Sequence, residues 1–328
     1  MKQQGFTLVE WMIAMLIGVF LLSGVFAIFV ASRATSDDAT DQSELLENGR
    51  IAMRLITQDL RWAGFWGDYT GGSLTVGDEL TLSSGAVIAN DCLDERNQGS
   101  LPSNLFPIRP LWVSHVSATK AMSGFSCIPV ASRAPDTDVI SIKRLIGSPV
   151  TGALDANRFY MATTTQTARL FRGNESIPSE ASMPGRQIWE YQHLIYYLSP
   201  TADGNIELRK RMLTANSGSW LVSGAMADGI ERMVLLYGVD TSNVPDGSID
   251  AFVNNANVTS QEWGEGRVMA VRVYLLVRSL QSSNDYRNNN VYQLGDVSVS
   301  GNGDGYRRLL LESTVSLRNP MVIAGGSS

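Results

Sequence analysis

The chain opens with a long apolar stretch near its N-terminus. From Trp11 to Ala31 every residue is apolar or small, and none is charged. At about 1.5 Å rise per residue, a helix of this length extends about 30 Å, which matches the hydrocarbon core of a bilayer. The pattern therefore predicts a transmembrane helix.

The segment from Thr35 to Ala63 continues this helix in amphipathic form. It contains no proline, and small or apolar residues recur at spacings compatible with one helical face. Acidic residues lead the exposed side and arginines follow, namely Asp37, Asp38, Asp41, Glu44 and Glu47, then Arg50, Arg54 and Arg61. Gly64 and Gly67 predict the end of the helix. We expect one helix whose inner half crosses the membrane and whose outer half packs on a globular head.

After about residue 68 the pattern changes to short β-prone runs separated by Gly, Asn, Asp and Ser. Apolar and polar residues alternate in 269–277 and 307–318, as in antiparallel strands that are buried on one face. A hairpin is predicted from 74–76 and 79–82, a hairpin turn at 301–305, and long loops at 85–135 and 243–263. Further strands are predicted at 139–145, 158–162, 168–171, 188–198, 206–212 and 230–237. The sequence thus predicts an α+β fold, with the long helix packed on a large antiparallel β-sheet head at 67–328, in one or two subdomains.

One acidic residue, Glu10, interrupts the start of the apolar segment. A carboxylate costs about 2.5–3.5 kcal/mol at the centre of a membrane helix, and less near the interface. Glu10 is therefore a candidate functional residue, whose partner we expect to be a cation held in the same apolar layer.

The residues Gly5-Phe6-Thr7-Leu8-Val9-Glu10 ahead of this helix resemble the class III leader of type IV prepilins and pseudopilins. The resemblance implies a leader peptide at 1–5, which a prepilin peptidase removes after Gly5, and an N-methylated Phe6 at the new N-terminus. It divides the helix into a membrane and assembly part at 6–33 and an amphipathic periplasmic part at 34–66. It also implies that Glu10 pairs with the positive N-terminus of a neighbouring subunit during assembly.

Two simpler interpretations of the N-terminal segment are an ordinary secretory signal peptide and a plain single-pass anchor. Val25-Phe26-Ala27 offers small residues for signal cleavage. However, the apolar run is too long for a signal peptide, and signal peptides do not carry an acidic residue at the position of Glu10. A plain anchor leaves the Gly-Phe-Thr-Leu-Val-Glu sequence unexplained. We expect a cytoplasmic N-terminus and an exported head, although Lys2 and Arg33 give little charge bias between the two sides.

Later segments are similar to PilW-type minor pilins of type IV pili. They are the residues 58–67 at the helix exit, Ala227-Asp228-Gly229-Ile230, Tyr237-Gly238-Val239-Asp240, residues 271–278 and Val315-Ser316-Leu317-Arg318-Asn319. The resemblance implies a minor pilin that primes pilus assembly, with other minor pilins, the major pilin and a tip adhesin as partners. It places the chain first in the inner membrane and then at the pilus tip. The midway helix proline of major pilins is absent, which leaves Gly18, Ser23 and Gly24 as the flexible points.

Two alternatives to this function stay open. A J-type pseudopilin of a type II secretion system shares the helix exit but is usually shorter. A membrane-anchored binding or adhesin domain that never assembles belongs to another class. Nucleic-acid binding is not expected, because the formal net charge is -6 and no stripe of basic and aromatic residues occurs.

The sequence has two cysteines, Cys92 and Cys127, and in an exported chain such a pair predicts one disulfide. It would close a loop of about 36 residues and contribute roughly 3–4 kcal/mol. Two buried free thiols are the alternative. A metal site is not expected from two sulfurs without clustered histidines.

Enzymatic activity is not expected. Of the two histidines, His193 falls on an apolar strand face, where a partly buried and hydrogen-bonded role is more common than catalysis, and His115 lies in a Ser-rich loop. No nucleophile elbow, phosphate-binding glycine loop or zinc motif occurs. Cofactors are therefore not expected, with one exception.

The exception is a weak calcium candidate at Asp240, Asp246 and Asp250. Asn and Asp crowd this loop, and their hard oxygen ligands suit Ca²⁺. The spacing does not fit an EF-hand, and turn formation explains the same residues.

Overall fold

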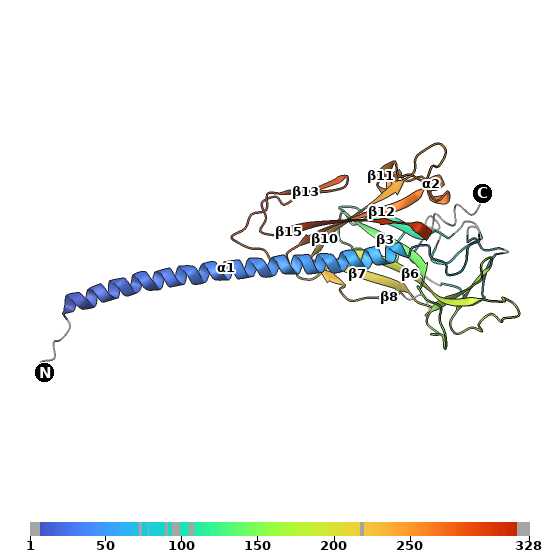
Figure 1. Ribbon diagram of the computed structural model, residues 1–328, viewed down its shortest axis with the longest axis horizontal. Coiled ribbons are helices and arrows are strands. Elements are labelled where there is room, and N and C mark those ends of the chain that lie inside the picture. Colours follow the sequence, from blue (N-terminus) through green and yellow to red (C-terminus); the bar gives the residue numbers. More distant parts are fainter. Residues whose placement is uncertain are drawn as a thin grey trace.

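The computed structural model describes residues 7–71, 74–77, 79–88, 91–93, 99–104, 108–216 and 220–319. A single helix, α1 (Leu8–Arg61), extends from the N-terminal end to a β-rich head. Its 54 residues correspond to about 80 Å, of which only the outer part contacts the head (Figure 1). The predicted α+β architecture of long helix and sheet-rich head is confirmed.

The larger sheet has nine strands, of which six follow the order β1-β5-β4-β6-β3-β2. The long strand β6 pairs with β4 near its start and with β7 near its end, and β8 and β9 pair with β7. All pairs are antiparallel except β1 with β5. The strands are β1 (Leu80–Leu82), β2 (Leu111–Val116), β3 (Thr137–Leu145), β4 (Phe159–Thr163), β5 (Ala168–Arg172), β6 (Gln187–Pro200), β7 (Ile206–Leu213), β8 (Trp220–Val222) and β9 (Ala227–Asp228).

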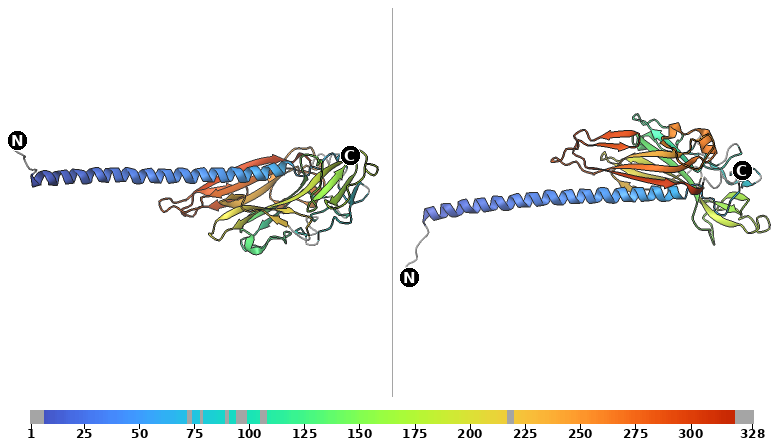
Figure 2. Two further views of the ribbon diagram at one scale, coloured as in Figure 1. Left: turned by 90° about the horizontal axis from the view of Figure 1, so that it is seen from below. Right: turned by 45° about the horizontal axis from the view of Figure 1, so that its top comes forward.

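A second, four-stranded antiparallel sheet has the order β11-β10-β12-β15, and a separate hairpin is formed by β13 and β14. These strands are β10 (Ile230–Val239), β11 (Ala251–Val253), β12 (Val268–Arg278), β13 (Val291–Leu294), β14 (Val297–Ser300) and β15 (Arg308–Ser316). Among the described residues, three short helices lie in connections: η2 (Val130–Ser132), η3 (Asn255–Asn257) and α2 (Ser260–Gly264). Strand β15 runs alongside the outer half of α1 (Figure 2).

One continuous hydrophobic core joins α1 to both sheets. It contains Leu45, Ala52, Ile56 and Leu60 from the helix together with inward residues of β2, β3, β6, β7, β10, β12 and β15. A second core lies on the other face of the large sheet and holds most of the buried aromatic residues. Because the helix supplies part of the first core, its outer half is an integral part of the head.

Residues 269–277 were predicted to form a strand that is buried on one face, but in the structure both faces of this strand are covered. Val271, Val273, Leu275 and Val277 face the common core as expected. The opposite face of β12 is also covered, since Tyr274 and Leu276 pack with Leu294 from the β13–β14 hairpin. A strand buried on both faces was therefore mistaken for a strand buried on one.

Several local predictions were wrong. Residues 79–82 do not form an antiparallel hairpin with 74–76; Val76 makes one isolated parallel bridge to Leu80, and β1 pairs with β5. The turn at 301–305 does not join paired strands, because β14 pairs with β13 and Asp304 bridges to Asn288. The supposed loops 85–135 and 243–263 contain β2, β11 and α2.

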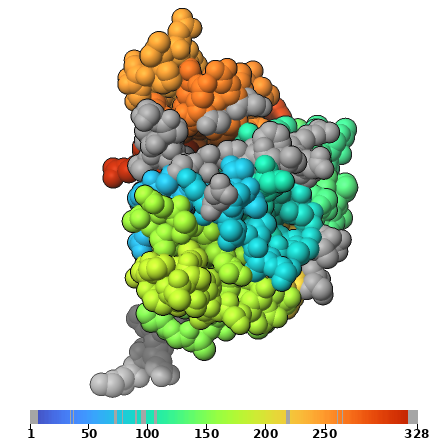
Figure 3. Space-filling model, turned by 90° about the vertical axis from the view of Figure 1, so that its right-hand side faces the viewer, coloured from blue at the N-terminus to red at the C-terminus, as the bar shows by residue number. Residues whose placement is uncertain are grey.

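The surface farthest from the N-terminal end of α1 is built from segments that are distant in sequence. The view onto this end shows residues following the helix beside those near 150–190 and near 240–265 (Figure 3). Long connections between strands thus supply the distal surface of the head.

Candidate assembly site

The inner end of α1 is closed by a reciprocal hydrogen-bonded cap. Thr7 is the N-cap residue, and its Oγ1 accepts a hydrogen bond from the Glu10 backbone N–H at 3.3 Å. The Glu10 carboxylate accepts in return from the Thr7 N–H at 2.8 Å and from the Thr7 hydroxyl at 2.9 Å, both on Oε2. This is a capping box, in which a threonine and a glutamate three residues later satisfy each other's backbone donors.

Glu10 keeps one acceptor free. Its Oε1 has no hydrogen-bond partner among the residues that the structure describes, and the side chain is exposed. An ionised carboxylate can accept from several donors at once. The cap therefore fixes the carboxylate at the helix start while leaving an oxygen for a donor from outside. Gly5 and Phe6, the predicted cleavage and methylation residues, lie outside the described residues.

Sequence reasoning singled out Glu10 but missed the role of Thr7. The signal was present, because Thr7-Leu8-Val9-Glu10 has the S/T-x-x-E spacing of a capping box ahead of an apolar run. Glu10 was considered only as a counter-charge for another subunit.

The helix above Glu10 exposes apolar side chains on all sides. Leu8, Trp11, Phe20 and Leu22 are each more than 60% exposed, and no part of the most apolar window is buried by the head. A helix that is apolar all around requires burial in a membrane or against other helices. By length and composition it suffices to cross a bilayer.

The outer half of α1 is held to the large sheet by a buried polar contact. The Asp59 carboxylate accepts one hydrogen bond from Arg144 Nη2 on β3, at 2.8 Å, and another from the Tyr196 hydroxyl on β6. Burial and the Asp59 charge raise the pKa of Tyr196 well above its usual value, so the hydroxyl stays protonated and can donate. Closer to the N-terminal end of α1, Arg307 ahead of β15 pairs with Asp38 of the helix.

The helix ends at Arg61, before the predicted boundary at 66. Asn319 Nδ2 donates to the carbonyl oxygens of Arg61 and Ala63, at 3.4 and 3.2 Å, which satisfies orphan carbonyls at the helix terminus. Gly64 and Gly67 follow with φ angles of 70° and 67°, a conformation that glycine adopts without strain. The chain then turns into the head.

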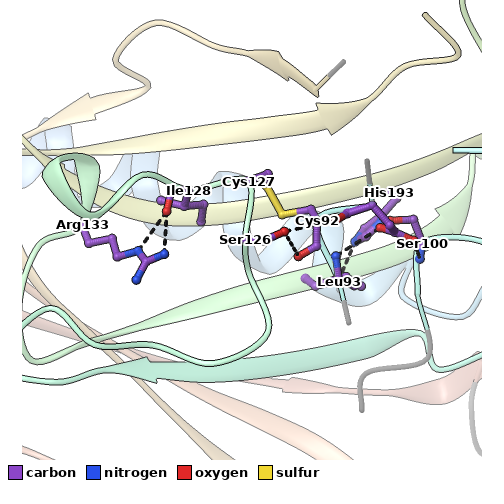
Figure 4. The surroundings of a disulfide bond; sticks show 10 residues. Cys92, Leu93, Ser100, Ser126, Cys127, Ile128, Arg133 and His193 are labelled. Atoms are coloured by element: carbon purple, nitrogen blue, oxygen red, sulfur yellow. Dashed lines mark hydrogen bonds between the residues drawn. A yellow bond between two sulfur atoms is a disulfide. The ribbon is translucent and has the colours of Figure 1, made fainter. Parts of the chain in front are cut away.

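Cys92 and Cys127 form a disulfide bond in the head (Figure 4). Ser126, next to Cys127, donates its backbone N–H to the Cys92 carbonyl at 3.0 Å, so the two segments are also joined by hydrogen bonding. Farther along, the Arg133 guanidinium donates to the Ile128 carbonyl. The two segments are thus fixed against the aromatic-rich core.

A buried lysine lies beneath this region. Lys143 on β3 is fully buried, and its Nζ donates to the Gly99 carbonyl. Burial lowers the pKa of Lys143 to about 7; Asp91 acts against this shift and Arg109 adds to it. Lys143 therefore carries its proton only at a substantial desolvation cost.

Both histidines have hydrogen-bonding partners within the head. His193 is hydrogen-bonded as predicted but fully rather than partly buried; its Nε2 lies 2.7 Å from Ser141 Oγ and its ring packs edge-on against Trp220. Burial lowers the pKa of His193 well below its usual value, and the charge of Lys143 adds to the effect. His115 Nδ1 pairs with Asp138 at 2.9 Å near the surface.

The aspartates of the calcium candidate loop bind donors of their own chain. Asp240 accepts from the backbone N–H groups of Ser242, Asp246 and Gly247 at 2.9–3.0 Å. The Asp250 carboxylate accepts from Thr241 and Ser242. Throughout the described ranges, no three His, Cys, Asp or Glu side chains group in a way that could hold a metal ion. Turn formation accounts for these residues.

Two family models match the chain. The model described as Type IV Pilus-assembly protein W matches residues 195–319, from within β6 to just beyond β15. The Prokaryotic N-terminal methylation motif matches residues 1–26, which include Thr7, Glu10 and much of the apolar helix. No curated protein and no solved structure matches the chain. These matches point to a structural protein.

Proposed function

We propose that this chain is a minor pilin that primes type IV pilus assembly and takes part in it. The match of residues 195–319 to the Type IV Pilus-assembly protein W model and the match of residues 1–26 to the methylation motif support this proposal. Its N-terminal helix docks with other minor pilins at the pilus tip, and the major pilin polymerises behind them. A tip adhesin is the further partner. The head selects these partners, and the apolar helix supplies the common packing surface.

The position of Glu10 carries this proposal. The carboxylate lies at the inner end of an exposed apolar helix; one of its oxygens is held by Thr7, and the other has no partner among the described residues. An unpaired carboxylate and an unpaired amine each have a high free energy in the apolar layer of a membrane. Forming an ion pair between them offsets this cost. A neighbouring subunit that offers its methylated N-terminal amine at this depth therefore docks in one register.

The proposed path begins in the inner membrane. The chain inserts once, with its N-terminus in the cytoplasm and its head in the periplasm. Prepilin peptidase then cleaves after Gly5 and methylates Phe6, which creates the positive amine that another subunit's acid can bind. The subunit leaves the membrane when its helix exchanges lipid for the helices of its neighbours.

Substitution of Glu10 in cells that assemble pili tests the proposal. Glu10→Gln keeps the size and hydrogen-bonding capacity of the side chain but removes the charge, and Glu10→Ala removes both. We expect both variants to be cleaved and inserted normally, to enter sheared pili at a level at least tenfold lower, and to reduce surface piliation. Glu47→Gln, an exposed acid on the outer half of the same helix, is the matched control and should behave as the wild type.

Normal piliation and normal incorporation of both Glu10 variants would contradict the docking role. Deletion of the chain separates the alternatives. Loss of pili supports a priming minor pilin, whereas loss of protein export with intact pili indicates a pseudopilin. A chain that stays in the inner membrane while pili form normally would be an anchored binding domain.

A further inference from the structure

Strand β15 forms an open edge of the four-stranded sheet. It pairs with β12 over nine consecutive residues without a bulge, and with no other strand in the part of the chain that the structure describes. Edge strands that lack a bulge, a proline or a cover can pair with another extended chain. β15 contains no proline.

The hydrogen bonds at both ends of β15 show which backbone groups face outward. Leu317 donates its N–H to the Met269 carbonyl, and Arg307 accepts from the Ser279 N–H. In an antiparallel pair the direction alternates from residue to residue, so odd-numbered residues of β15 bond to β12. The backbone groups of Leu310, Glu312, Thr314 and Ser316 therefore point away from the sheet, and among the described residues none has a backbone partner on that side.

An open groove runs between this edge and the outer half of α1. Met53, Thr57 and Gln58 of the helix line it together with Leu311 and Glu312 of β15. A Cβ at Gly49 would lie 2.5 Å from Leu311 Cδ1, so the helix lies directly over the inner face of β15. The groove thus has a helix wall on one side and free backbone groups on the other.

The charge of the groove is positive and unneutralised. Arg50, Arg54 and Arg61 line it, and their exposed side chains form no ion pair with any described residue. The one acid of the groove, Glu312, lies 3.5 Å from Arg272 and so already has a partner. Arg307, ahead of β15, differs in that it pairs with Asp38 of α1. Three unpaired guanidinium groups favour an acidic occupant.

The spacing of these charges fits an extended chain. Arg50 and Arg54 are separated by four residues, or about 6 Å along the helix axis. Side chains on one face of a β-strand recur every two residues, or about 6.6 Å. Acidic residues at alternating positions of an added strand would therefore meet successive arginines.

We propose that the free edge of β15 is a strand-addition site, which accepts an extended segment with alternating acidic residues from another pilus subunit. Main-chain hydrogen bonds to β15 supply affinity, and the arginines of α1 supply selectivity, as in other cases of β-augmentation. Residues 320–328 of this chain contain no acidic side chain and fit the groove poorly in charge. The identity of the partner class rests on the proposed function, whereas the open edge and its arginines do not.

Photo-crosslinking in cells that assemble pili tests the inference on the full chain. A benzoylphenylalanine placed at Ser316, which faces outward, should form an adduct with another subunit, and mass spectrometry should map that adduct to a segment with alternating acids. The same group at Val291 on β13, which is 66% exposed, is the control position and should not form this adduct.

Two variant pairs sharpen the test. Thr314→Pro removes one outward N–H without breaking the bonds to β12, and should lower the adduct yield at least fivefold, while Thr314→Val keeps the N–H and should not. Arg50→Glu combined with Arg54→Glu should lower the yield at least tenfold, and Lys120→Glu, which makes the same charge change per site on a distant turn, should leave it unchanged.

An adduct that maps to residues 320–328 or to a second copy of the chain would overturn the proposed occupant. Absence of any adduct at Ser316, or equal yields for all variants, would overturn the site. Because the adduct is measured whether or not pili form, this failure is distinguishable from a failure of the Glu10 docking role.

Discussion

The Tyr196 hydroxyl on β6 donates a hydrogen bond to the Asp59 carboxylate on α1, which joins the membrane helix to the larger sheet. Both side chains are buried, and Arg144 lies on the same carboxylate. The contact is a buried polar link between the helix and the nine-stranded sheet, so its loss should weaken the attachment of α1 to that sheet.

We expect Asp59→Ala to lower the free energy of unfolding by about 3–5 kcal/mol, because it leaves the Arg144 guanidinium largely buried without a counter-charge. Tyr196→Phe should cost only about 1–2 kcal/mol, since the ion pair survives. Urea unfolding of the detergent-solubilised full-length chain, followed by tryptophan fluorescence, measures both. Equal losses for the two variants would show that Arg144 does not depend on Asp59.

Gly67→Ala should be more harmful than an alanine at a comparable turn. A Cβ at Gly67 would lie 2.5 Å from Trp189 Nε1, and that nitrogen is held by a 2.9 Å hydrogen bond to Thr163 Oγ1. Gly185 also has a positive φ, of 72°, but a Cβ there meets nothing within 4 Å. The left-handed strain of about 1–2 kcal/mol is common to both variants. The overpacking cost of about 1–3 kcal/mol falls on Gly67→Ala alone, and urea midpoints should show this difference.

Stability should rise with pH between 7.5 and 9 because of Lys143. Its pKa is lowered to about 7 in the folded chain, from 10.5, so in this window the unfolded chain binds the proton and the folded chain does not. Each pH unit should add at most about 1.4 kcal/mol, and the gain should be lost as the pH falls toward 7.

Lys143→Met should flatten this pH profile and raise the stability at pH 7. Equilibrium urea unfolding at several pH values gives the comparison, and the range stays below that in which tyrosines ionise. An unchanged slope in the methionine variant would assign the effect to another group.

Loss of the disulfide should destabilise the head without changing its fold. The bond joins residues separated by 35 positions, so Cys92→Ser with Cys127→Ser should lower the free energy of unfolding by about 3–4 kcal/mol through loop entropy. Reductant should weaken the wild type by a similar amount and have no effect on the double variant. Thermal melts with and without reductant compare the two proteins.

The fold was predictable where one periodicity dominated. The uninterrupted apolar run and its amphipathic continuation predicted α1, and simple alternation predicted the inner face of β15 with Val315 and Leu317. Pairing was not predictable, because β1 binds in parallel to β5, more than eighty residues away, and nothing local specifies that register. β2 was missed because His115 and Ser114 break the alternation, and its other residues are covered from both sides.

The candidate site was predictable in part for a related reason. Glu10 stands out as a charge in an apolar run, whereas the arginines of α1 look like an ordinary solvated helix face. Only the structure shows that Arg50, Arg54 and Arg61 lack ion-pair partners among the described residues, and that a strand edge without a described partner lies beside them. These arginines form part of the proposed binding site because β15, which is distant in sequence, lies beside them in the fold.

The two attachment points of α1 join the helix and the head into one rigid unit. Asp59 and Asp38 are 21 residues apart, or about 30 Å along one unbroken helix, and each is fastened to the head. Because the head is attached to α1 at two separate points, it cannot rotate about the helix axis. When neighbouring subunits tilt or rotate α1, the head must therefore move with it as one body. A small tilt of the helix produces a larger displacement at the distal end of the head.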